Sequence, residues 1–425
     1  MPEAEPTALS ASYLASRDEV ERVLLLYSGG LDTSVMCKWI QDEYGAEVVA
    51  LTVNLGQPGE DYDVVRQKAL DLGAVAAEVV DAREEFARDF IVPAIKANAV
   101  YGLGYPLFTA LGRPLIAKVA VEQARIHGCD TIAHGCTGKG NDQVRIEGTV
   151  ATLAPELKVI APVREWQMGR EEEIAYAREH NIPIKGGAEQ TPYSIDDNLW
   201  GRSSEGRWIE ELDRAPEQDV FQLVTPPALA PDEPEMVEVE FEKGVPVALN
   251  GERMGLVDLL EKAAQVGARH GVGIIDHIED RIVGLKVRDI YEVPAAAIIL
   301  PAHAELERLT GTIHQNRFKE GLDRQWAYLV YAGLWWEPLR VNLDAFMDSA
   351  NETATGTIGV ECFKGVARVV TRSSPYAVYD ASLATFETSG GLFSQNASPG
   401  FIELWSLQSR MAHRLRESLA DDQDG

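Results

Sequence analysis

The stretch RVLLLYSGGLDTSVMCKWIQDEY, residues 22–44, joins an apolar run to a glycine-rich turn and then to a helical pattern. Residues 22–27 are typical of a buried strand, residues 34–44 of a helix, and VVALTVNL at 48–55 of a second strand rich in β-branched residues. A strand, a tight loop, a helix and a further strand within about 35 residues make a βαβ unit with parallel strands.

The same alternation continues along the chain. Helical and strand-like segments follow one another at 61–72, 76–82, 114–127, 130–135, 158–163 and 169–180. This order predicts an α/β fold in which helices cover both faces of an open, doubly wound and mostly parallel sheet. We assign this first domain to residues 21–185.

The pattern then changes. Residues 211–235 contain five prolines and several acidic residues, which predicts an extended loop or linker. In 236–254, apolar residues alternate with glutamates and Asn250-Gly251 marks a turn, as in a half-exposed antiparallel hairpin. With a further strand-like piece at 281–287, these segments predict a second, α+β domain over residues 186–395.

Both ends of the chain differ from these domains. The first twenty residues lack the basic start and the continuous apolar segment of a secretion signal, so we expect a flexible polar tail at 1–20. Residues 401–420 carry apolar residues at helical spacing, which predicts an amphipathic helix followed by an acidic tail within 396–425. Its apolar stripe can pack on its own domain or on another subunit, and the spacing alone does not choose between them.

Composition limits the classes of partner. The chain has 425 residues, too many for one ordinary core, and its 39 basic and 67 acidic residues give a net charge of −28. Most of its surface therefore repels nucleic acid and anionic membranes, and we expect neither as a partner. No apolar stretch approaches the roughly 18 residues of a membrane span. Four cysteines do not make a disulfide framework in so long a chain, which favours a reducing cytoplasm.

The turn YSGGLDTS, residues 27–34, is a candidate anion site. A loop between a strand and a helix presents unpaired backbone N–H groups and the positive end of the helix dipole, and Gly29 and Gly30 let the backbone approach a ligand. The loop lacks the lysine of G-x-x-x-x-G-K-S/T, so it is a different phosphate loop. Asp32 would repel a polyphosphate unless it binds Mg²⁺ or caps the helix. The alternative is a tight turn without a ligand.

A second glycine-rich loop, AHGCTGKGNDQVR at 133–145, also follows a predicted strand. Loops at the ends of parallel strands open into the same crevice, so the two loops can share one ligand, and Lys139 supplies the charge that the first lacks. The alternative is a long surface loop with solvated charges. The stretch HGCDTIAHGC at 127–136 holds four potential metal ligands, but their spacing fits no zinc pattern.

With both loops in view, the sequence resembles the argininosuccinate synthase family. The matching motifs run from about residue 22 to the closing helix, and they are YSGGLDTS, VNLGQ (53–57), YPLFTALGRP (105–114), HGCTGKGNDQVR, IAPVREW, YSIDDNLWGRSSE (193–205) and HGVGIIDHIEDRIVGLKVRDIYEVPA. The first loop alone would indicate only the wider N-type ATP pyrophosphatase superfamily. Many motifs in matching order are far more specific.

The resemblance implies an ATP-dependent ligase that forms a C–N bond. In that family the ureido oxygen of citrulline attacks the α-phosphorus of ATP, giving citrullyl-AMP and pyrophosphate, and the amine of aspartate then displaces AMP to form argininosuccinate for arginine biosynthesis. The resemblance further implies Mg²⁺ and a homotetramer to which the terminal helix contributes. Residues 21–185 would then be the nucleotide-binding domain and 186–395 the synthetase domain.

The resemblance also assigns roles to individual residues. It places the nucleotide on Tyr27, Ser28, Gly29, Gly30, Leu31, Asp32, Thr33, Ser34, Val53, His134, Gly135, Thr137, Gly138, Lys139 and Gly140. It places aspartate on Thr137, Asn141 and Asp142. It places citrulline on Tyr105, Thr109, Asn141, Arg145, Ser194, Ser203, Glu279 and Tyr291. Asp32, Asp142 and Arg145 are the expected catalytic residues.

Within this assignment, Arg145 suits the citrulline carboxylate and Glu279 its ammonium group. One departure is Ala110, where some members of the family carry a serine, so one hydrogen bond to citrulline is missing unless Thr109 supplies it. No general base emerges. The attacking amine can lose its proton to a phosphate oxygen or to Asp142.

Two other functions are compatible with the loops. A tRNA-thiolating enzyme of the same superfamily needs reactive cysteines and a basic RNA-binding face, and the net charge of −28 argues against that face. A non-catalytic ATP-binding module would not need a large second domain that carries Ser194, Ser203, Glu279 and Tyr291.

Overall fold

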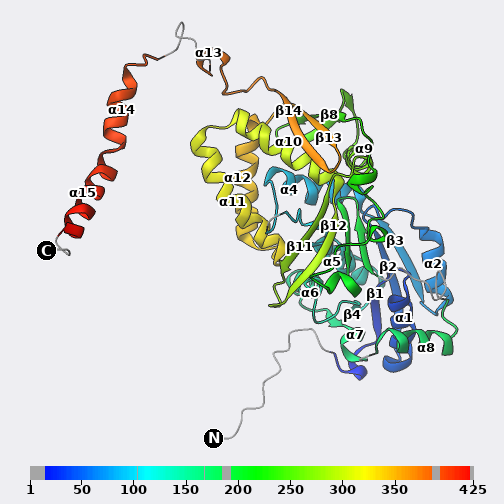
Figure 1. Cartoon of the computed structure of the whole chain (residues 1–425). Coiled ribbons are helices and arrows are strands. Elements are labelled where there is room, and N and C mark those ends of the chain that lie inside the picture. Colours follow the sequence, from blue (N-terminus) through cyan, green and yellow to red (C-terminus); the bar gives the residue numbers. More distant parts are fainter. Residues whose placement is uncertain (1–14, 103, 167, 184–192, 385–392, 422–425) are drawn as a thin grey trace, which may run out of the picture. The chain divides into compact units, whose positions relative to one another are not determined.

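The computed structural model describes residues 15–102, 104–166, 168–183, 193–384 and 393–421 (Figure 1). Most of the tail expected at 1–20 lies outside the described residues. The chain divides into two compact units, with the boundary between Tyr376 and Ala377. The three sheets belong to the large first unit, and each unit is described by itself.

A parallel sheet with the strand order β3-β2-β1-β4-β5 forms the first part of the large unit. Its strands are β1 (Arg22–Leu26), β2 (Glu47–Asn54), β3 (Ala76–Asp81), β4 (Thr131–Ala133) and β5 (Lys158–Ile160). The flanking helices are α1 (Leu31–Tyr44), α2 (Tyr62–Asp71), α5 (Phe108–His127), α6 (Asp142–Leu153), α7 (Pro162–Glu165) and α8 (Arg170–Glu179).

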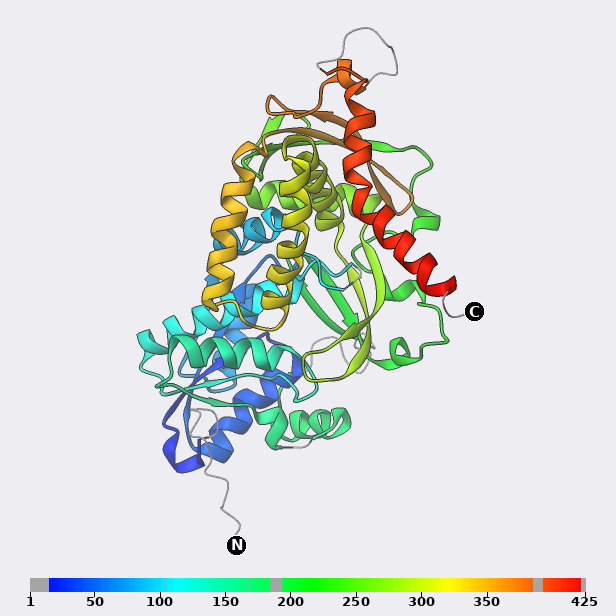
Figure 2. The same cartoon turned by 90° about the vertical axis from the view of Figure 1, so that its left-hand side faces the viewer.

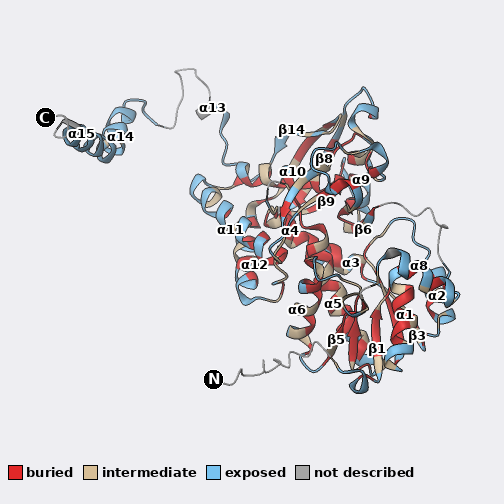
Figure 3. Ribbon diagram, turned by 60° about the horizontal axis from the view of Figure 1, so that its bottom comes forward, coloured by how far each residue is buried: buried red, intermediate tan, exposed pale blue. Residues whose placement is uncertain are grey.

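Side chains of β1 enter two different cores. Val23 and Leu25 share a core with α1 and α2, whereas Leu24 shares one with α5 and α6. Because successive side chains of a strand point to opposite faces, helices cover both faces of the sheet, and the strands read as continuous apolar runs (Figure 3). The prediction of an open, doubly wound α/β domain is confirmed.

The large unit also contains two antiparallel sheets. The four-stranded sheet, in the order β11-β12-β7-β6, consists of β6 (Ser194–Asn198), β7 (Gly201–Glu205), β11 (Ile274–Asp280) and β12 (Lys286–Glu292). The other sheet, in the order β10-β9-β8-β13-β14, consists of β8 (Glu235–Glu242), β9 (Val245–Leu249), β10 (Glu252–Arg253), β13 (Gly356–Phe363) and β14 (Val366–Ser373).

Helices complete the large unit. They are α3 (Arg83–Glu85), a π-helical turn (Phe86–Ile91), α4 (Val92–Lys96), α9 (Leu256–Arg269), α10 (Pro294–Thr310), α11 (Ile313–Tyr331) and α12 (Pro338–Ala350). Helices α11 and α12 lie side by side, where Phe318 and Phe346 make an edge-to-face contact (Figure 2). Trp335 is buried and stacks on Phe90, so it contributes to the packing of the interior. The prediction of a second part of α+β type is confirmed.

Three local expectations differ from the structure. Helix α5 begins at Phe108 and not near residue 114, because Leu107 takes a left-handed conformation and Pro114 is accommodated inside the helix. The expected linker at 211–235 is a packed loop, since Val220 and Val224 are buried in it. The strand expected at 281–287 is mostly a turn, and β12 begins only at its end.

The small unit is helical. It contains α13 (Ala381–Ala384), α14 (Ala397–Trp405) and α15 (Leu407–Asp421), so the predicted terminal helix is confirmed with a break at Ser406. Helices α14 and α15 are coloured mostly as exposed in Figure 3. Their exposed large apolar residues are Phe401, Ile402, Leu404, Trp405, Leu407, Met411, Leu415 and Leu419. None of the helices in the described part of the chain has both the length and the apolar character that crossing a bilayer requires.

Candidate active site

The strand order of the parallel sheet reverses between β1 and β4. β1 continues into α1 on one face and β4 into α6 on the other. In doubly wound sheets, the crevice at such a reversal is where ligands bind, outside the carboxyl ends of the strands. Both glycine-rich loops predicted as ligand sites begin at this point.

Hydrogen bonds of its own hydroxyl groups stabilise the conformation of the first loop. Ser34 Oγ donates to the carbonyl of Gly30 at 2.6 Å, and Ser28 Oγ lies 3.2 Å from Thr33 Oγ1. Gly30 ends the loop in an extended conformation, and α1 starts at Leu31, so the first N–H groups of the helix face the crevice. Gly29 has a φ of +76°, a conformation that only glycine adopts without strain.

Asp32 and Leu31 stand in the first turn of α1, where Asp32 is exposed and Leu31 is buried. Lys68 of α2 donates to the carbonyl of Gly29 at 2.8 Å. This lysine supplies a cation beside a loop that has none in its own sequence. Because Lys68 lies about forty positions after Gly29, the motif YSGGLDTS does not indicate it.

The second loop is built around His134. This buried imidazole accepts the backbone N–H of Cys136 on Nδ1 at 3.1 Å, and its Nε2 lies 3.0 Å from Glu147 Oε1. With Nδ1 acting as acceptor, the proton is on Nε2 and is donated to Glu147. The hydrogen bonds of both ring nitrogens of His134 therefore stabilise the conformation of the second loop. Beyond it, Thr137, Gly138 and Lys139 are exposed, and Gly140 is half-buried before α6 begins.

A cavity of about 230 Å³ lies between the two loops. Its lining includes the predicted nucleotide residues Tyr27, Ser28, Val53, His134 and Gly135. The remaining lining residues are Leu26, Leu51, Thr52, Gln57, Arg113, Ile116, Cys136, Ile146 and Asp196. The structure thus brings the two loops to one cavity, together with two charged residues that the sequence did not single out.

Those two residues, Arg113 and Asp196, belong to an ion-pair network. Arg113 Nε donates to Asp142 Oδ2 at 2.7 Å, and its Nη2 pairs with Asp196. Arg145 Nη1 donates to the other oxygen of Asp142 at 2.8 Å. Burial alone would raise the pKa of Asp142, but the two guanidinium groups outweigh burial and lower it to about 2. Asp142 is therefore a carboxylate at neutral pH.

Arg145 is buried and already holds several partners. Its Nε and Nη2 donate to the carbonyl of Tyr331 at 3.1 and 3.0 Å, and Nη1 also reaches Thr109 Oγ1 at 3.4 Å. Thr109 Oγ1 in turn lies 2.7 Å from the hydroxyl of Tyr105. Ala110 is fully buried beside them. These contacts link the guanidinium of Arg145 to α5, to the start of α6 and to the end of α11.

A second polar cluster surrounds Glu279. The hydroxyls of Tyr291 and Tyr331 donate to its two carboxylate oxygens at 2.5 and 2.6 Å. Burial raises the pKa of Glu279, but His277, whose Nε2 lies 3.6 Å from Oε2, and the hydrogen bonds from Tyr291 and Tyr331 outweigh this and lower it overall. Asn141 joins the cluster to the second loop, because its side-chain amide donates to the Tyr331 hydroxyl at 2.9 Å.

One face of the four-stranded sheet carries most of this cluster. Strand register pairs Asp196 with Ser203, Ser203 with Tyr291, and His277 with Asp289. Because cross-strand partners and alternate residues share a face, the polar face consists of Ser194, Asp196, Ser203, Glu205, His277, Glu279, Asp289 and Tyr291. The opposite face carries Ile290, which shares a small core with Trp208 and Val220, and also the ion pair between Asp276 and Arg288.

The sequence missed several members of this site. Arg113 and Asp196 stand within the quoted motifs, but nothing in the sequence pairs them with Asp142. Tyr331 at the end of α11 belongs to none of the quoted motifs. Arg281 and Asp289 lie within a quoted motif, but the sequence assigned no role to either. Ser194 on the edge strand β6 is exposed, and Ser203 on the inner strand β7 is half-buried.

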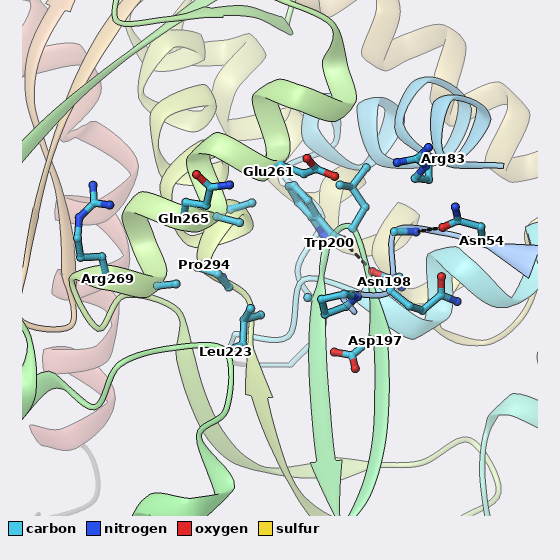
Figure 4. Close-up of a pocket in the computed structure, with 18 of the residues that line it drawn as sticks. Asn54, Arg83, Asp197, Asn198, Trp200, Leu223, Glu261, Gln265, Arg269 and Pro294 are labelled. Atoms are coloured by element: carbon cyan, nitrogen blue, oxygen red, sulfur yellow. Dashed lines mark hydrogen bonds between the residues drawn. The ribbon is translucent and has the colours of Figure 1, made fainter. Parts of the chain in front are cut away.

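A larger cavity of about 640 Å³ lies next to the first (Figure 4). Figure 4 shows Glu261 and Gln265 of α9 across from Asn198 and Trp200 at the turn between β6 and β7. The two cavities share Gln57, whose side chain bonds the backbone of Leu55 and Val53. No sequence motif indicated this second cavity.

Comparison with known proteins gives one consistent result. The family model described as arginosuccinate synthase N-terminal HUP domain matches residues 22–183, and the arginosuccinate synthase C-terminal domain matches residues 193–412. Among solved structures, the U34-tRNA thiolase NcsA from Methanococcus maripaludis aligns over 41% of this chain and 60% of its own at 22% identity, with a TM-score of 0.27, too low to support an argument.

Curated relatives match almost the whole chain. The argininosuccinate synthase of Rubrobacter xylanophilus is 52% identical over 92% of this chain and 94% of its own. That of Symbiobacterium thermophilum is 50% identical over 94% of this chain and 99% of its own, and that of Pyrococcus furiosus is 48% identical over 93% and 95%. With both family models matched in order and half of all positions identical, this chain belongs to the argininosuccinate synthase family of ATP-dependent ligases.

Proposed function

We propose that this enzyme joins L-citrulline and L-aspartate to form argininosuccinate, with conversion of ATP to AMP and pyrophosphate, as a step of arginine biosynthesis. One observation carries the proposal. Arg113 lines the cavity between the two glycine-rich loops and also binds Asp142, which Arg145 links to the cluster around Glu279. The cavity between the loops and the cluster around Glu279 are thus joined by a chain of polar contacts that runs through Asp142, Arg145 and the carbonyl of Tyr331.

The chemistry suits such an arrangement. A neutral ureido carbon is a poor electrophile, and transfer of adenylate to its oxygen creates citrullyl-AMP with a good leaving group. Catalysis then depends on positioning and on neutralising phosphate charge. The loop at 27–34 would hold pyrophosphate on its N–H groups and hydroxyls, Val53 would contact the adenosine, and Gly135 with Thr137–Gly140 would close over the phosphates.

For citrulline, Arg145 would bind the carboxylate and Glu279 the ammonium group, while Tyr105, Thr109, Asn141, Ser194, Ser203 and Tyr291 would bind the remaining polar edges. For aspartate, Thr137 and Asn141 would bind carboxylates and Asp142 the ammonium group. A carboxylate with a pKa of about 2 is a weak base, so the proton of the attacking amine passes to a phosphate oxygen. Asp142 then orients the amine.

The donors at the first loop fit a Mg²⁺ ion that arrives with ATP. Such an ion binds substrate phosphates, waters and only one or two carboxylates, and Asp32 with the neighbouring hydroxyls offers that kind of set. In the described residues, no group of three or more His, Cys, Asp and Glu side chains is arranged to hold a metal ion. When bound, Mg²⁺ would supply charge to stabilise the phosphates.

We further propose a cytoplasmic homotetramer in which α14 and α15 pack on other subunits. The exposed apolar residues of these helices support this, since Leu404 and Trp405 are 75% and 78% exposed within the single chain. Large contiguous apolar surfaces of this kind mark protein interfaces.

Release of AMP separates the candidate functions. ATP is supplied with citrulline, with aspartate, or with both, and AMP and argininosuccinate are measured by chromatography. We expect rapid AMP and argininosuccinate formation only when both amino acids are present. A non-catalytic ATP-binding module would release no AMP, and a tRNA-thiolating enzyme would not respond to either amino acid.

A further inference from the structure

Asp289 is a buried carboxylate that the protein leaves incompletely paired. It is 4% exposed, and its Oδ1 has no hydrogen-bond partner within the described residues. The nearest cation is Arg281, whose Nη2 lies 3.5 Å from Oδ1 and is already bound to Glu205 at 2.5 Å. A buried carboxylate without a full set of donors is costly, which points to a donor that the free protein does not contain.

The position of Asp289 shows where that donor would be. Tyr291 places its hydroxyl 2.5 Å from Glu279 Oε2 and 3.4 Å from Asp289 Oδ2. The phenol has one proton, and the shorter contact shows that Glu279 receives it. Two carboxylates therefore lie around one phenol oxygen, and Asp289 accepts little from it.

The charges around Asp289 are negative in excess. Glu205 on β7 and Glu279 on β11 are acidic, and they face Asp289 together with Arg281 and His277. His277 lies directly across from Asp289 in the strand register, and its Nε2 has no hydrogen-bond partner in the described part of the chain. Three carboxylates thus face one guanidinium and one imidazole. A primary ammonium group, with one positive charge and three donors, matches this deficit.

We propose that Asp289 is a substrate-contacting residue that shares with Glu279 the binding of the citrulline α-ammonium group, which rests on the function proposed above. The two carboxylates clamp the ammonium from both sides of Tyr291. The enzyme then discriminates against ureido compounds that lack the α-amine more strongly than Glu279 alone would allow.

The clamp is sensitive to pH. Burial, followed by the charges of Glu205 and Glu279, raises the pKa of Asp289 to about 7, against the opposing effect of Arg281 and His277. Above that pH the carboxylate is charged and binds the ammonium, and below it the acid is neutral and binds it weakly. The KM for citrulline is therefore expected to rise as the pH falls from about 8 to about 6.

Asp289→Asn tests the clamp, because asparagine keeps the shape and removes the charge. Asp276→Asn is the matched control, since Asp276 belongs to the same sheet but lies on its other face, beside its register partner Ile290, and pairs with Arg288. We measure the KM for citrulline and the inhibition constant of 5-ureidopentanoic acid, which is citrulline without its amine. Circular dichroism melting curves verify folding of both variants.

In Asp289→Asn we expect the KM for citrulline to rise about tenfold and the inhibition constant of the analogue to change less than about twofold, as for loss of a charged hydrogen bond. The dependence of this KM on pH should also flatten, whereas Asp276→Asn should match the wild type. Equal weakening of citrulline and analogue, or no change in either, would overturn the clamp. Absence of citrulline-dependent AMP release in the wild type would instead contradict the proposed function.

Discussion

Asp142 lies between the guanidinium groups of Arg113 and Arg145, and this pairing fixes its charge. Its pKa of about 2 keeps it ionised throughout the physiological range. Titration of Asp142 therefore contributes nothing to the activity profile near neutral pH. Any dependence on pH in that range has to come from other groups, and Asp289 beside Glu279, with its pKa raised to about 7, is one such group.

Substitution Asp142→Ala is expected to separate nucleotide binding from product formation. ATP affinity should change less than about threefold, while argininosuccinate formation should fall about 100-fold because the amine of aspartate loses the carboxylate that orients it. Titration calorimetry with ATP and a product assay measure the two effects. Asp71→Ala on the surface of α2, where the carboxylate accepts from Gln67, is the control. Unchanged turnover in Asp142→Ala would remove Asp142 from the mechanism.

The two glycine-rich loops are the elements that the sequence predicted best. The hydroxyls of Ser28, Thr33 and Ser34 in the first loop act through neighbours only a few positions away, and such local patterns are visible in a sequence. Arg113 and Tyr331 were missed because their partners lie tens to hundreds of positions away. Asn141 and Tyr331, for example, are separated by 190 positions, and only the packing of α11 brings them together.

Gly29→Ala is expected to weaken ATP binding as well as stability. The left-handed conformation costs an alanine about 1 kcal/mol, and the added Cβ would lie 3.1 Å from Val65, so the loop must shift. Gly45→Ala at the end of α1 has a similar φ of +64° with no atom within 4 Å of the added Cβ. We expect both variants to lower the melting temperature, but only Gly29→Ala to raise the Kd for ATP. Equal ATP affinity in the two would exclude the loop from the nucleotide site.

Helices α14 and α15 present their apolar residues to solvent in the single chain, which is unfavourable unless another surface covers them. Truncation after Pro399 removes α15 and most of α14. We expect sedimentation velocity to show a smaller assembly, with the melting temperature of the remaining subunit little changed. An unaltered assembly size would show that these helices do not join the subunits.

One core of the large unit is continuous from Leu24 in the parallel sheet to Trp326 in α11. Hydrogen bonds cross the same boundary, since Asn141 binds both Tyr331 and the backbone of Ile282. The division at 185 and 186 that the sequence predicted stays a prediction about ancestry and function. In physical terms the two parts share one interior, which the composition of a sequence does not reveal.

The bonds of Asn141 to Tyr331 and Ile282 have a consequence for inheritance. The two family models meet between residues 183 and 193, the natural joint for genetic exchange between lineages. After a crossover there, the second glycine-rich loop would come from one parent gene. Tyr331 and Ile282, which bind its Asn141, would come from the other. Such hybrids would have to rebuild an interior and a reaction centre at once, so the gene is expected to pass between lineages intact.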